Sequence, residues 1–239
     1  MMAFCILFVK VRNNREVYEI ERIRNKKVPV KTIFSERRDL GMDGAYRPVG
    51  EEEVMRFNEE LSQKRDYTVE DIRKLPEDAR AELIDGQIYY FAAPKTVHQT
   101  VAGRLYLKLQ NHIDEKQGEC QAFVAPLDVC LDEDDKTLLE PDVFVVCDKR
   151  KIHEDACYGA PDLIIEIVSK STKKRDYGIK MMKYRTAGVK EYWIVDPDRK
   201  TVLISWFEDE SVNCLYSFED EISFRLFPEV TVRIQDWIL

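Results

Sequence analysis

The stretch PDLIIEIVSKS, residues 161–171, places one carboxylate inside an otherwise apolar strand. The aliphatic residues 163–165 and 167–168 on either side of Glu166 predict a short strand that is buried on both faces. A carboxylate in such a strand is costly to bury unless something compensates its charge. Glu166 therefore either has a structural ion-pair partner or holds a cation for chemistry. Any fold proposed for this chain has to bring that partner or cation to the strand.

The chain from Tyr67 onward alternates strand-like and helix-like segments. Strands are predicted at 82–84, 87–91, 122–131, 143–146 and 192–195, and helices at about 96–113 and 173–187. Asp85-Gly86 suits a tight hairpin turn, and Gly188 suits the residue that follows a helix end. If the strand at 143–146 pairs with the Glu166 strand, residues at their ends can meet at one spot.

Residues 1–65 differ from this pattern, and we expect them to form an N-terminal extension to a domain at 66–239. Of the 239 residues, 44% are hydrophobic and 34% are charged, as expected for a soluble globular protein. No apolar run approaches the roughly 20 residues that span a bilayer, so no membrane partner is expected. The six cysteines form no C-x-x-C pair, which favours reduced thiols in a cytoplasmic protein over a zinc site.

The distribution of charge is uneven along the chain. The net charge of −8 argues mildly against wholesale binding of nucleic acid. The segment 170–190, however, contains eight Lys or Arg residues and one acid, Asp176. This basic segment begins two residues after the Glu166 strand. It predicts either a surface that contacts phosphates or simply a solvated helix face.

A metal ion at the Glu166 strand would need a second carboxylate. Mg²⁺ takes oxygen ligands at about 2.1 Å, so two ligands of one ion lie only a few ångströms apart. Asp162 precedes Glu166 by four residues, roughly 13 Å along an extended chain, which is too far. Asp142 stands after Pro141 at the mouth of the strand 143–146 and can point to the same spot if the two strands pair. A divalent cation between Asp142 and Glu166 would remove the cost of burying both.

A basic group is also expected at this spot, to handle protons or to stabilise negative charge. Asp176, Lys180 and Tyr184 are spaced i, i+4, i+8, so they line one face of the basic helix. Lys180 can reach the end of the strand from that face. The alternative is a buried ion pair between Glu166 and Lys180 with no metal.

Several short motifs together are similar to those of a known family. They are Glu82-Leu83-Ile84-Asp85-Gly86, Pro94 with His98-Gln99, Pro141-Asp142, Gly159-Ala160-Pro161-Asp162, Glu166-Ile167-Val168-Ser169, then Asp176, Lys180, Tyr184 and the run GVKEYWIVDP at 188–197. An acid after Pro, a Glu in an apolar strand and a basic helix resemble the PD-(D/E)XK nuclease superfamily. The order and spacing from Tyr67 to Leu239 more closely resemble the Uma-type restriction endonucleases, whose lysine has moved to the helix.

The resemblance implies a restriction-endonuclease-like α/β fold, with a mixed central sheet flanked by helices. It implies that Mg²⁺ or Mn²⁺ is bound by Asp142, Glu166 and the backbone carbonyl of Ile167. Lys180 would be the catalytic lysine, and Glu82 would add a further carboxylate. Other candidates for the site are His98, Lys170, Asp176 and Tyr184. Lys170 stands where the family commonly has Pro and is a rival for the lysine role, and His98 either leans into the cleft or packs as an ordinary histidine.

These observations predict a metal-dependent endonuclease that hydrolyses phosphodiester bonds of nucleic acid, with DNA as the expected substrate. A homodimer is expected, because the resemblance suggests it and the C-terminal strands have edges to protect. The alternative is a catalytically inactive nuclease-fold module that binds nucleic acid or a protein partner. The sequence leaves the form of the substrate and any recognition sequence open.

Overall fold

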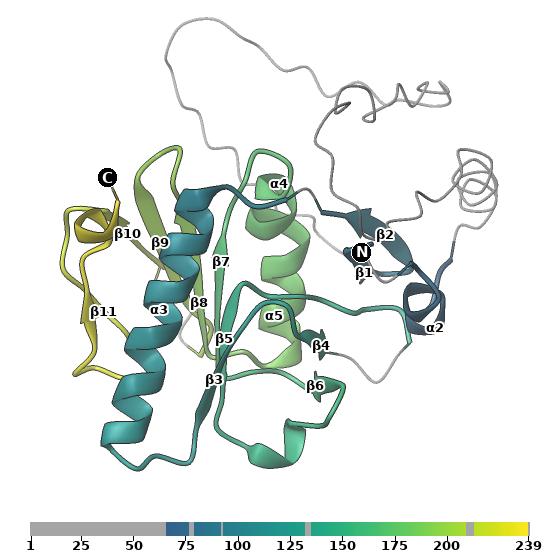
Figure 1. Ribbon diagram of the computed structural model, residues 1–239, viewed down its shortest axis with the longest axis horizontal. Helices are drawn as coiled ribbons and strands as arrows, with labels where there is room; N and C mark the ends of the chain where they lie inside the picture. The colour runs from purple at the N-terminus through teal and green to yellow at the C-terminus, as the bar shows by residue number, and fades with distance from the viewer. Residues whose placement is uncertain (1–65, 77–78, 92, 132–134, 209–212, 239) are drawn as a thin grey trace, which may run out of the picture. The chain divides into compact units, whose positions relative to one another are not determined.

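The computed structural model describes residues 66–239, apart from residues 77–78, 92, 132–134, 209–212 and 239. Its main element is a six-stranded sheet with the strand order β10-β9-β8-β7-β5-β3 (Figure 1). The strands are β3 (Gln121–Val124), β5 (Val143–Val146), β7 (Leu163–Ile167), β8 (Glu191–Asp196), β9 (Thr201–Trp206) and β10 (Asn213–Ser217). The extension predicted at 1–65 lies outside the described residues.

The sheet is mixed, and the expected α/β architecture is confirmed. β7 and β8 run parallel, and every other neighbouring pair in the sheet is antiparallel. The connection from β7 to β8 consists of α4 (Lys173–Arg175), the π-helical segment η2 (Asp176–Lys180) and α5 (Met181–Ala187). β5 pairs with β7, with Val143 opposite Ile165. This register places Asp142, just before β5, beside the end of β7.

Side chains that alternate along the strands form a core on each face of the sheet. One core packs against α3 (Thr96–Glu115), whose buried stripe follows the predicted pattern at Val101, Leu105, Leu109 and Ile113. The other core contains Ile164 and Ile194 together with Tyr184 of α5. Because alternate residues of a strand point to opposite faces, Glu166 shares the face of Ile164. Glu166 is therefore directed toward the helical connection.

A separate hairpin precedes α3. It follows α2 (Val69–Arg73) and consists of β1 (Ala81–Ile84) and β2 (Gln87–Tyr90), with Glu82 opposite Tyr89. Asp85 and Gly86 have φ angles of 49° and 74°, the left-handed conformations that a tight Asp-Gly turn requires. The predicted hairpin is confirmed, and its first strand carries Glu82 into the domain.

The prediction of a single strand at 122–131 is wrong, because the structure has two strands there. β3 ends at Val124, and a separate strand β4 (Asp128–Cys130) leaves the main sheet to pair in parallel with β6 (Ala156–Tyr158). Pro126 stands between the two strands, and a proline cannot donate a hydrogen bond to a sheet ladder. The apolar pattern on both sides of Pro126 therefore belongs to two elements.

The C-terminal part adds short elements to the α3 side. They are β11 (Ile222–Ser223), β12 (Thr231–Val232) and the 3₁₀ helix η3 (Ile234–Trp237). Ile222, Val232 and Ile234 join the core that packs against α3. Another 3₁₀ turn, η1 (Lys149–Lys151), follows β5. None of the described helices is both long enough and apolar enough to cross a membrane.

The expectation of reduced cysteines is wrong for one pair. Cys120 and Cys147 form a disulfide. Gln121 pairs with Val146 across β3 and β5, so the residues that flank this pair face each other in the antiparallel register. The 27-residue separation of the two cysteines did not reveal this, because it becomes informative only once the register is known. Cys130, Cys157 and Cys214 are free.

Candidate active site

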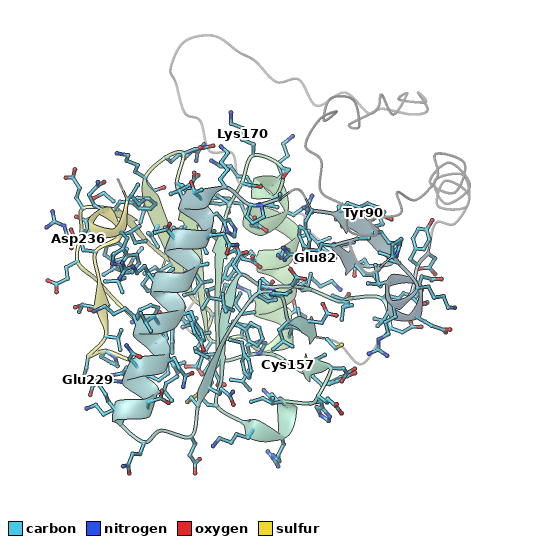
Figure 2. The ribbon with its side chains drawn as sticks, viewed as in Figure 1. Glu82, Tyr90, Cys157, Lys170, Glu229 and Asp236 are labelled. Carbon is cyan, nitrogen blue, oxygen red and sulfur yellow. A yellow bond between two sulfur atoms is a disulfide. The ribbon has the colours of Figure 1, made fainter. Side chains whose placement is uncertain are left out.

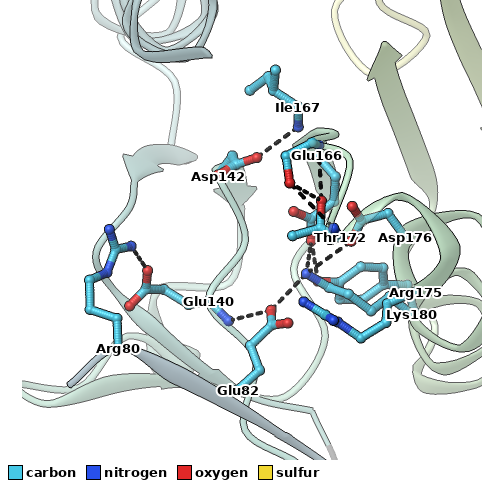
Figure 3. A network of polar contacts seen from close by, with 12 residues as sticks. Arg80, Glu82, Glu140, Asp142, Glu166, Ile167, Thr172, Arg175, Asp176 and Lys180 are labelled. Carbon is cyan, nitrogen blue, oxygen red and sulfur yellow. Dashed lines mark hydrogen bonds and ion pairs between the residues drawn. The ribbon is translucent and has the colours of Figure 1, made fainter. Parts of the chain in front are cut away.

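The buried partner of Glu166 is Lys180. The Lys180 ammonium nitrogen lies 2.6 Å from Oε1 of Glu166, 2.6 Å from Oε1 of Glu82 and 3.6 Å from Oδ1 of Asp176 (Figure 3). Asp176 and Lys180 are the first and last residues of the π-helical segment, a type of turn that often occurs at functional sites. All four side chains are at most 5% exposed. Three carboxylates from three elements thus surround one ammonium group.

Tyr184 fixes the position of Glu166. Its hydroxyl donates a hydrogen bond of 2.7 Å to Oε1 of Glu166, and the whole residue is buried in the core of that face. Asp176, Lys180 and Tyr184 therefore all approach the strand from the same connection, as their spacing predicted. The carboxylate oxygen that Tyr184 contacts is the one that also contacts Lys180.

Glu82 ties the hairpin to this cluster. Its Oε1 accepts a hydrogen bond from the backbone N–H of Glu140 at 3.1 Å, in addition to its contact with Lys180. The Glu140 side chain in turn pairs with Arg80, at the start of the hairpin. The second oxygen of Glu82, Oε2, is buried and has no hydrogen-bond partner among the described residues.

Asp142 reaches the end of β7 from the neighbouring strand. Its Oδ2 accepts a hydrogen bond from the backbone N–H of Ile167 at 2.7 Å, so its carboxylate lies against the residue that follows Glu166. The Nε2 atom of His98, in the first turn of α3, lies 3.1 Å from the same oxygen. The structure thus brings His98 to Asp142, and the side chains of both are about one-sixth exposed (17% and 18%).

These groups lie at a cleft with a volume of about 390 Å³. Asp142, Glu166, Asp176, Lys180 and His98 line it. Cations from separate segments also line the cleft, namely Arg80, Lys95, Lys170 and Lys200. Glu82 is not among the described residues that line the cleft, although it contacts Lys180.

The electrostatics of the cluster follow from burial and charge. Burial raises the pKa of Glu166 well above its usual value; Lys180 opposes this effect, and Asp176 and Asp142 add to it. Burial acts to lower the pKa of Lys180, but the carboxylates of Glu166 and Glu82 raise it well above its usual value. The Lys180 ammonium group therefore stays charged. The pKa values of Glu82 and Asp176 are raised as well, so the carboxyl groups of this cluster resist ionisation unless a cation compensates them.

One basic residue and one acidic residue near β7, Lys170 and Asp162, are not part of the cluster. Lys170, the predicted rival of Lys180, is exposed, and Figure 2 shows its side chain pointing away from the domain. Asp162 lies at the other end of β7, where it accepts a hydrogen bond from the backbone N–H of Cys147 at 2.7 Å and pairs with Lys190 at 2.9 Å. Lys180 is therefore the lysine that contacts Glu166.

The donors at the cleft fit a divalent cation. Mg²⁺ is usually bound through one or two carboxylates, with water and phosphate oxygens in the remaining positions. Asp142 and Glu166 supply such carboxylates, and a cation would compensate their burial. No group of three or more His, Cys, Asp or Glu side chains in the described part of the chain is arranged to hold a metal ion. Water and substrate oxygens would therefore have to complete the coordination.

Arg175 is the residue of this site that sequence reasoning missed. It was counted only as part of the basic segment, although it directly precedes Asp176. Its guanidinium carbon lies 4.8 Å from the centre of the Tyr89 ring, and its positive charge acts on Glu82. Its place at the start of the turn that carries Asp176 and Lys180 was the available signal.

Comparisons with known proteins agree with this architecture. The family model described as "Uma2: Putative restriction endonuclease" matches residues 69–235. A crystal structure of "a putative nuclease belonging to DUF820" from Anabaena variabilis superposes with a TM-score of 0.58 and 22% sequence identity, over 71% of this chain and 96% of that one. At this identity the likeness shows a shared fold.

A curated relative matches a smaller part of the chain. An uncharacterized protein of Synechocystis sp. is 31% identical over 103 residues, which are 43% of this chain and 53% of that protein. The chain thus spans about half the length of this curated relative.

Proposed function

Because the chain belongs to the Uma2 family of putative restriction endonucleases, we propose that it is a metal-dependent endonuclease that hydrolyses phosphodiester bonds of nucleic acid. One observation carries this proposal. Asp142 and Glu166 approach each other from adjacent strands at a cleft, and Lys180 contacts Glu166 there at 2.6 Å. Paired carboxylates can hold a divalent ion for phosphodiester hydrolysis, and a charged lysine beside them can stabilise the charge that develops at the phosphate.

We assign the metal to Asp142, Glu166 and the backbone carbonyl of Ile167, with Mg²⁺ or Mn²⁺ as the ion. When bound, such an ion activates water and offsets the charge that develops at the phosphate. Lys180 lines the cleft and is the cleft cation that contacts the proposed metal ligand Glu166, from where we expect it to donate to a phosphate oxygen. Glu82 contacts Lys180 and keeps the ammonium charged and oriented.

The remaining side chains position the reacting groups. Tyr184 holds Glu166 through its hydroxyl, and Asp176 adds a third acid at 3.6 Å from the Lys180 ammonium group. His98 contacts Asp142 and fixes the direction of that carboxylate. The cations around the cleft can hold the phosphates that flank the scissile bond, which positions nucleic acid without reading its sequence.

Supercoiled plasmid DNA provides a direct test. We expect Mg²⁺- or Mn²⁺-dependent nicking by the full chain, and no nicking by Asp142→Ala. The matched control is Asp162→Ala, because Asp162 also follows a proline but lies at the other end of β7. Equal nicking by wild type and Asp142→Ala would overturn the assignment, and so would loss of nicking in the control alone.

A second candidate function is an inactive nuclease-fold module that binds nucleic acid or a protein. The observation that favours it is that Lys180 already neutralises parts of both Glu82 and Glu166, as a purely structural ion pair would. Calorimetric titration with Mn²⁺ separates the two candidates. No heat beyond dilution, together with retained salt-sensitive DNA binding, would support the module.

The homodimer remains a prediction. The outer strands of the main sheet are β3 and β10. Gln110 of α3 already accepts the backbone N–H of Ala122 on β3, so we expect a second copy to pair with the edge of β10. Analytical ultracentrifugation of the full chain measures the oligomeric state. A single species of 28.1 kDa at all concentrations would contradict the dimer.

A further inference from the structure

Several buried side-chain atoms near the active site have no hydrogen-bond partner within the described part of the chain, and three of them belong to Glu82 and Arg175. These three are Oε2 of Glu82 and the Nε and Nη2 atoms of Arg175. A carboxylate oxygen and two guanidinium donors are costly to leave unpaired in the interior, and native proteins rarely do so. The carboxylate oxygen of Glu82 and the two guanidinium donors of Arg175 carry opposite charges and lie in one region. Their lack of partners therefore needs an explanation.

Glu82 and Arg175 belong to the same neighbourhood. Glu82 pairs with Tyr89 across the hairpin, and the Arg175 guanidinium carbon lies 4.8 Å from the centre of the Tyr89 ring. Burial raises the pKa of Glu82, whereas the charges of Lys180 and Arg175 act in the opposite direction. In Figure 3 the Arg175 guanidinium group lies next to Lys180, on the side of Glu82. Arg175 is thus a second cation within electrostatic reach of Glu82.

The Lys180 ammonium group cannot donate fully to Glu82 and to a substrate phosphate at the same time. Its ammonium group is shared between Glu82 and Glu166, and it also lines the cleft. When it donates to a phosphate oxygen, Glu82 loses its nearest counter-charge. A carboxylate that is 1% exposed cannot turn to water instead, and an unpaired buried charge is strongly destabilising. A second donor at Oε2 would remove that obstacle.

The Arg175 side chain has the right chemistry for this task. One nitrogen, Nη1, donates to the backbone carbonyl of Ser171 at 3.3 Å, which anchors the group. Nε and Nη2 remain, and these two donors form the edge of the guanidinium plane that pairs with a carboxylate. Contact with the Tyr89 ring holds that plane near the hairpin.

We propose that Arg175 is a positioning residue, which takes the free Oε2 of Glu82 and thereby releases Lys180 to the substrate. The part about substrate rests on the proposed endonuclease function. The exchange of the two cations at Glu82 is a property of the folded chain, and it can be measured without any catalysis.

A double-mutant cycle on stability tests the exchange. Urea unfolding is measured for the full-length wild type, Lys180→Met, Arg175→Met and the double variant. If either cation can compensate Glu82 when the other is removed, the two substitutions together should destabilise more than expected. The unfolding equilibrium constant of the double variant should exceed the product of the two single-variant fold-changes by about tenfold or more. Agreement with that product within about twofold overturns the exchange. A Lys180→Met chain that does not fold also overturns it, because Arg175 then fails to hold Glu82.

Steady-state kinetics test the role in the reaction. We expect Arg175→Met to lower kcat about tenfold or more while KM for DNA changes less than about twofold, and Arg175→Lys to recover most of kcat. Arg185→Met is the matched control, because Arg185 also lies over an aromatic ring, that of Phe207 at 5.0 Å. Equal kcat for wild type and Arg175→Met overturns the positioning role. A wild type that cleaves no nucleic acid overturns the proposed function instead, and the stability cycle still decides the exchange.

Discussion

The Lys180 ammonium nitrogen lies 2.6 Å from Oε1 of Glu166, and both side chains are almost completely buried. This ion pair joins the centre of β7 to the helical connection that follows it. It differs from an isolated buried pair, because Lys180 also contacts Glu82 at 2.6 Å and Asp176 at 3.6 Å. Loss of the lysine would take the nearest cation from Glu166 and Asp176, whereas loss of one acid leaves the lysine with others. The two partners therefore differ in what they contribute to stability.

Glu166→Gln should greatly lower activity and leave stability almost unchanged. Glu82 and Asp176 still compensate Lys180, and removal of one carboxyl group relieves the crowding of acids in the cluster. We expect the free energy of unfolding to change by less than about 1 kcal/mol or to rise, and kcat to fall about 100-fold or more. Urea unfolding and plasmid nicking measure the two quantities. Loss of about 3 kcal/mol or more would show that Glu166 is mainly a structural partner of Lys180.

Glu191→Gln should show the opposite behaviour. Glu191 is fully buried at the start of β8, and its carboxylate accepts hydrogen bonds from Trp193 Nε1 at 2.7 Å and from the backbone N–H groups of Arg225 and Leu226 at 3.0 and 2.8 Å. A neutral amide accepts these bonds less strongly and places an N–H opposite one donor. We expect a loss of about 2 kcal/mol of stability with unchanged kcat of the folded protein. Unchanged stability would contradict this structural role.

Tyr184→Phe should separate the hydroxyl group from the packing of the ring. The ring stays in the core with Tyr192, 5.1 Å between centroids, and only the hydrogen bond to Glu166 is removed. We expect stability to fall by about 1 kcal/mol and kcat to fall about tenfold, because Glu166 loses a positioning contact. Tyr192→Phe is the control, since the Tyr192 hydroxyl donates to the backbone carbonyl of Asp176 and not to Glu166. A larger loss of kcat in the control than in Tyr184→Phe would contradict the assignment.

The parts of the fold that were predicted from sequence depend on local patterns. The apolar stripe of α3, the Asp-Gly turn at 85–86 and the apolar run of β5 are each visible within a few neighbouring residues. Glu166 stood out as a candidate because it is a charged residue inside an apolar strand. Lys180 was predictable because its spacing from Asp176 places both on one side of the turn, and the structure keeps them together although that turn is π-helical.

The parts that were missed depend on pairing between distant segments. The disulfide follows from the register of β3 against β5, and the break at Pro126 follows from β4 pairing with β6. Arg175 looked like any other residue of the basic segment, and only the hairpin, more than 80 residues earlier in the chain, gives it Tyr89 and Glu82 as neighbours. A single sequence does not show which distant segments pair or which residues become neighbours.

The free cysteines should differ in reactivity. Burial raises the pKa of the Cys157 thiol to about 11, and the side chain is 1% exposed. Because the thiolate is the reactive form, Cys157 should resist iodoacetamide at pH 8, whereas the partly exposed Cys214 should react. Cys120 and Cys147 should appear as a linked peptide pair before reduction. Peptide mass spectrometry measures all of these. Labelling of Cys157 as fast as Cys214 in the native protein, or separate peptides for Cys120 and Cys147, would contradict the structure.

Lys180 and Lys170 should have separable roles, although the sequence made them rivals. Lys180 is buried against Glu166 and Glu82, whereas Lys170 is exposed at the cleft. Lys180→Gln should lower kcat about 100-fold or more, because it removes the charge nearest the proposed metal ligands. Lys170→Gln should leave kcat nearly unchanged and weaken DNA binding, with a decrease of about one in the slope of log affinity against log salt. Single-turnover cleavage and binding titrations at several salt concentrations distinguish the two. A large loss of kcat in Lys170→Gln, with Lys180→Gln still active, would transfer the catalytic assignment to Lys170.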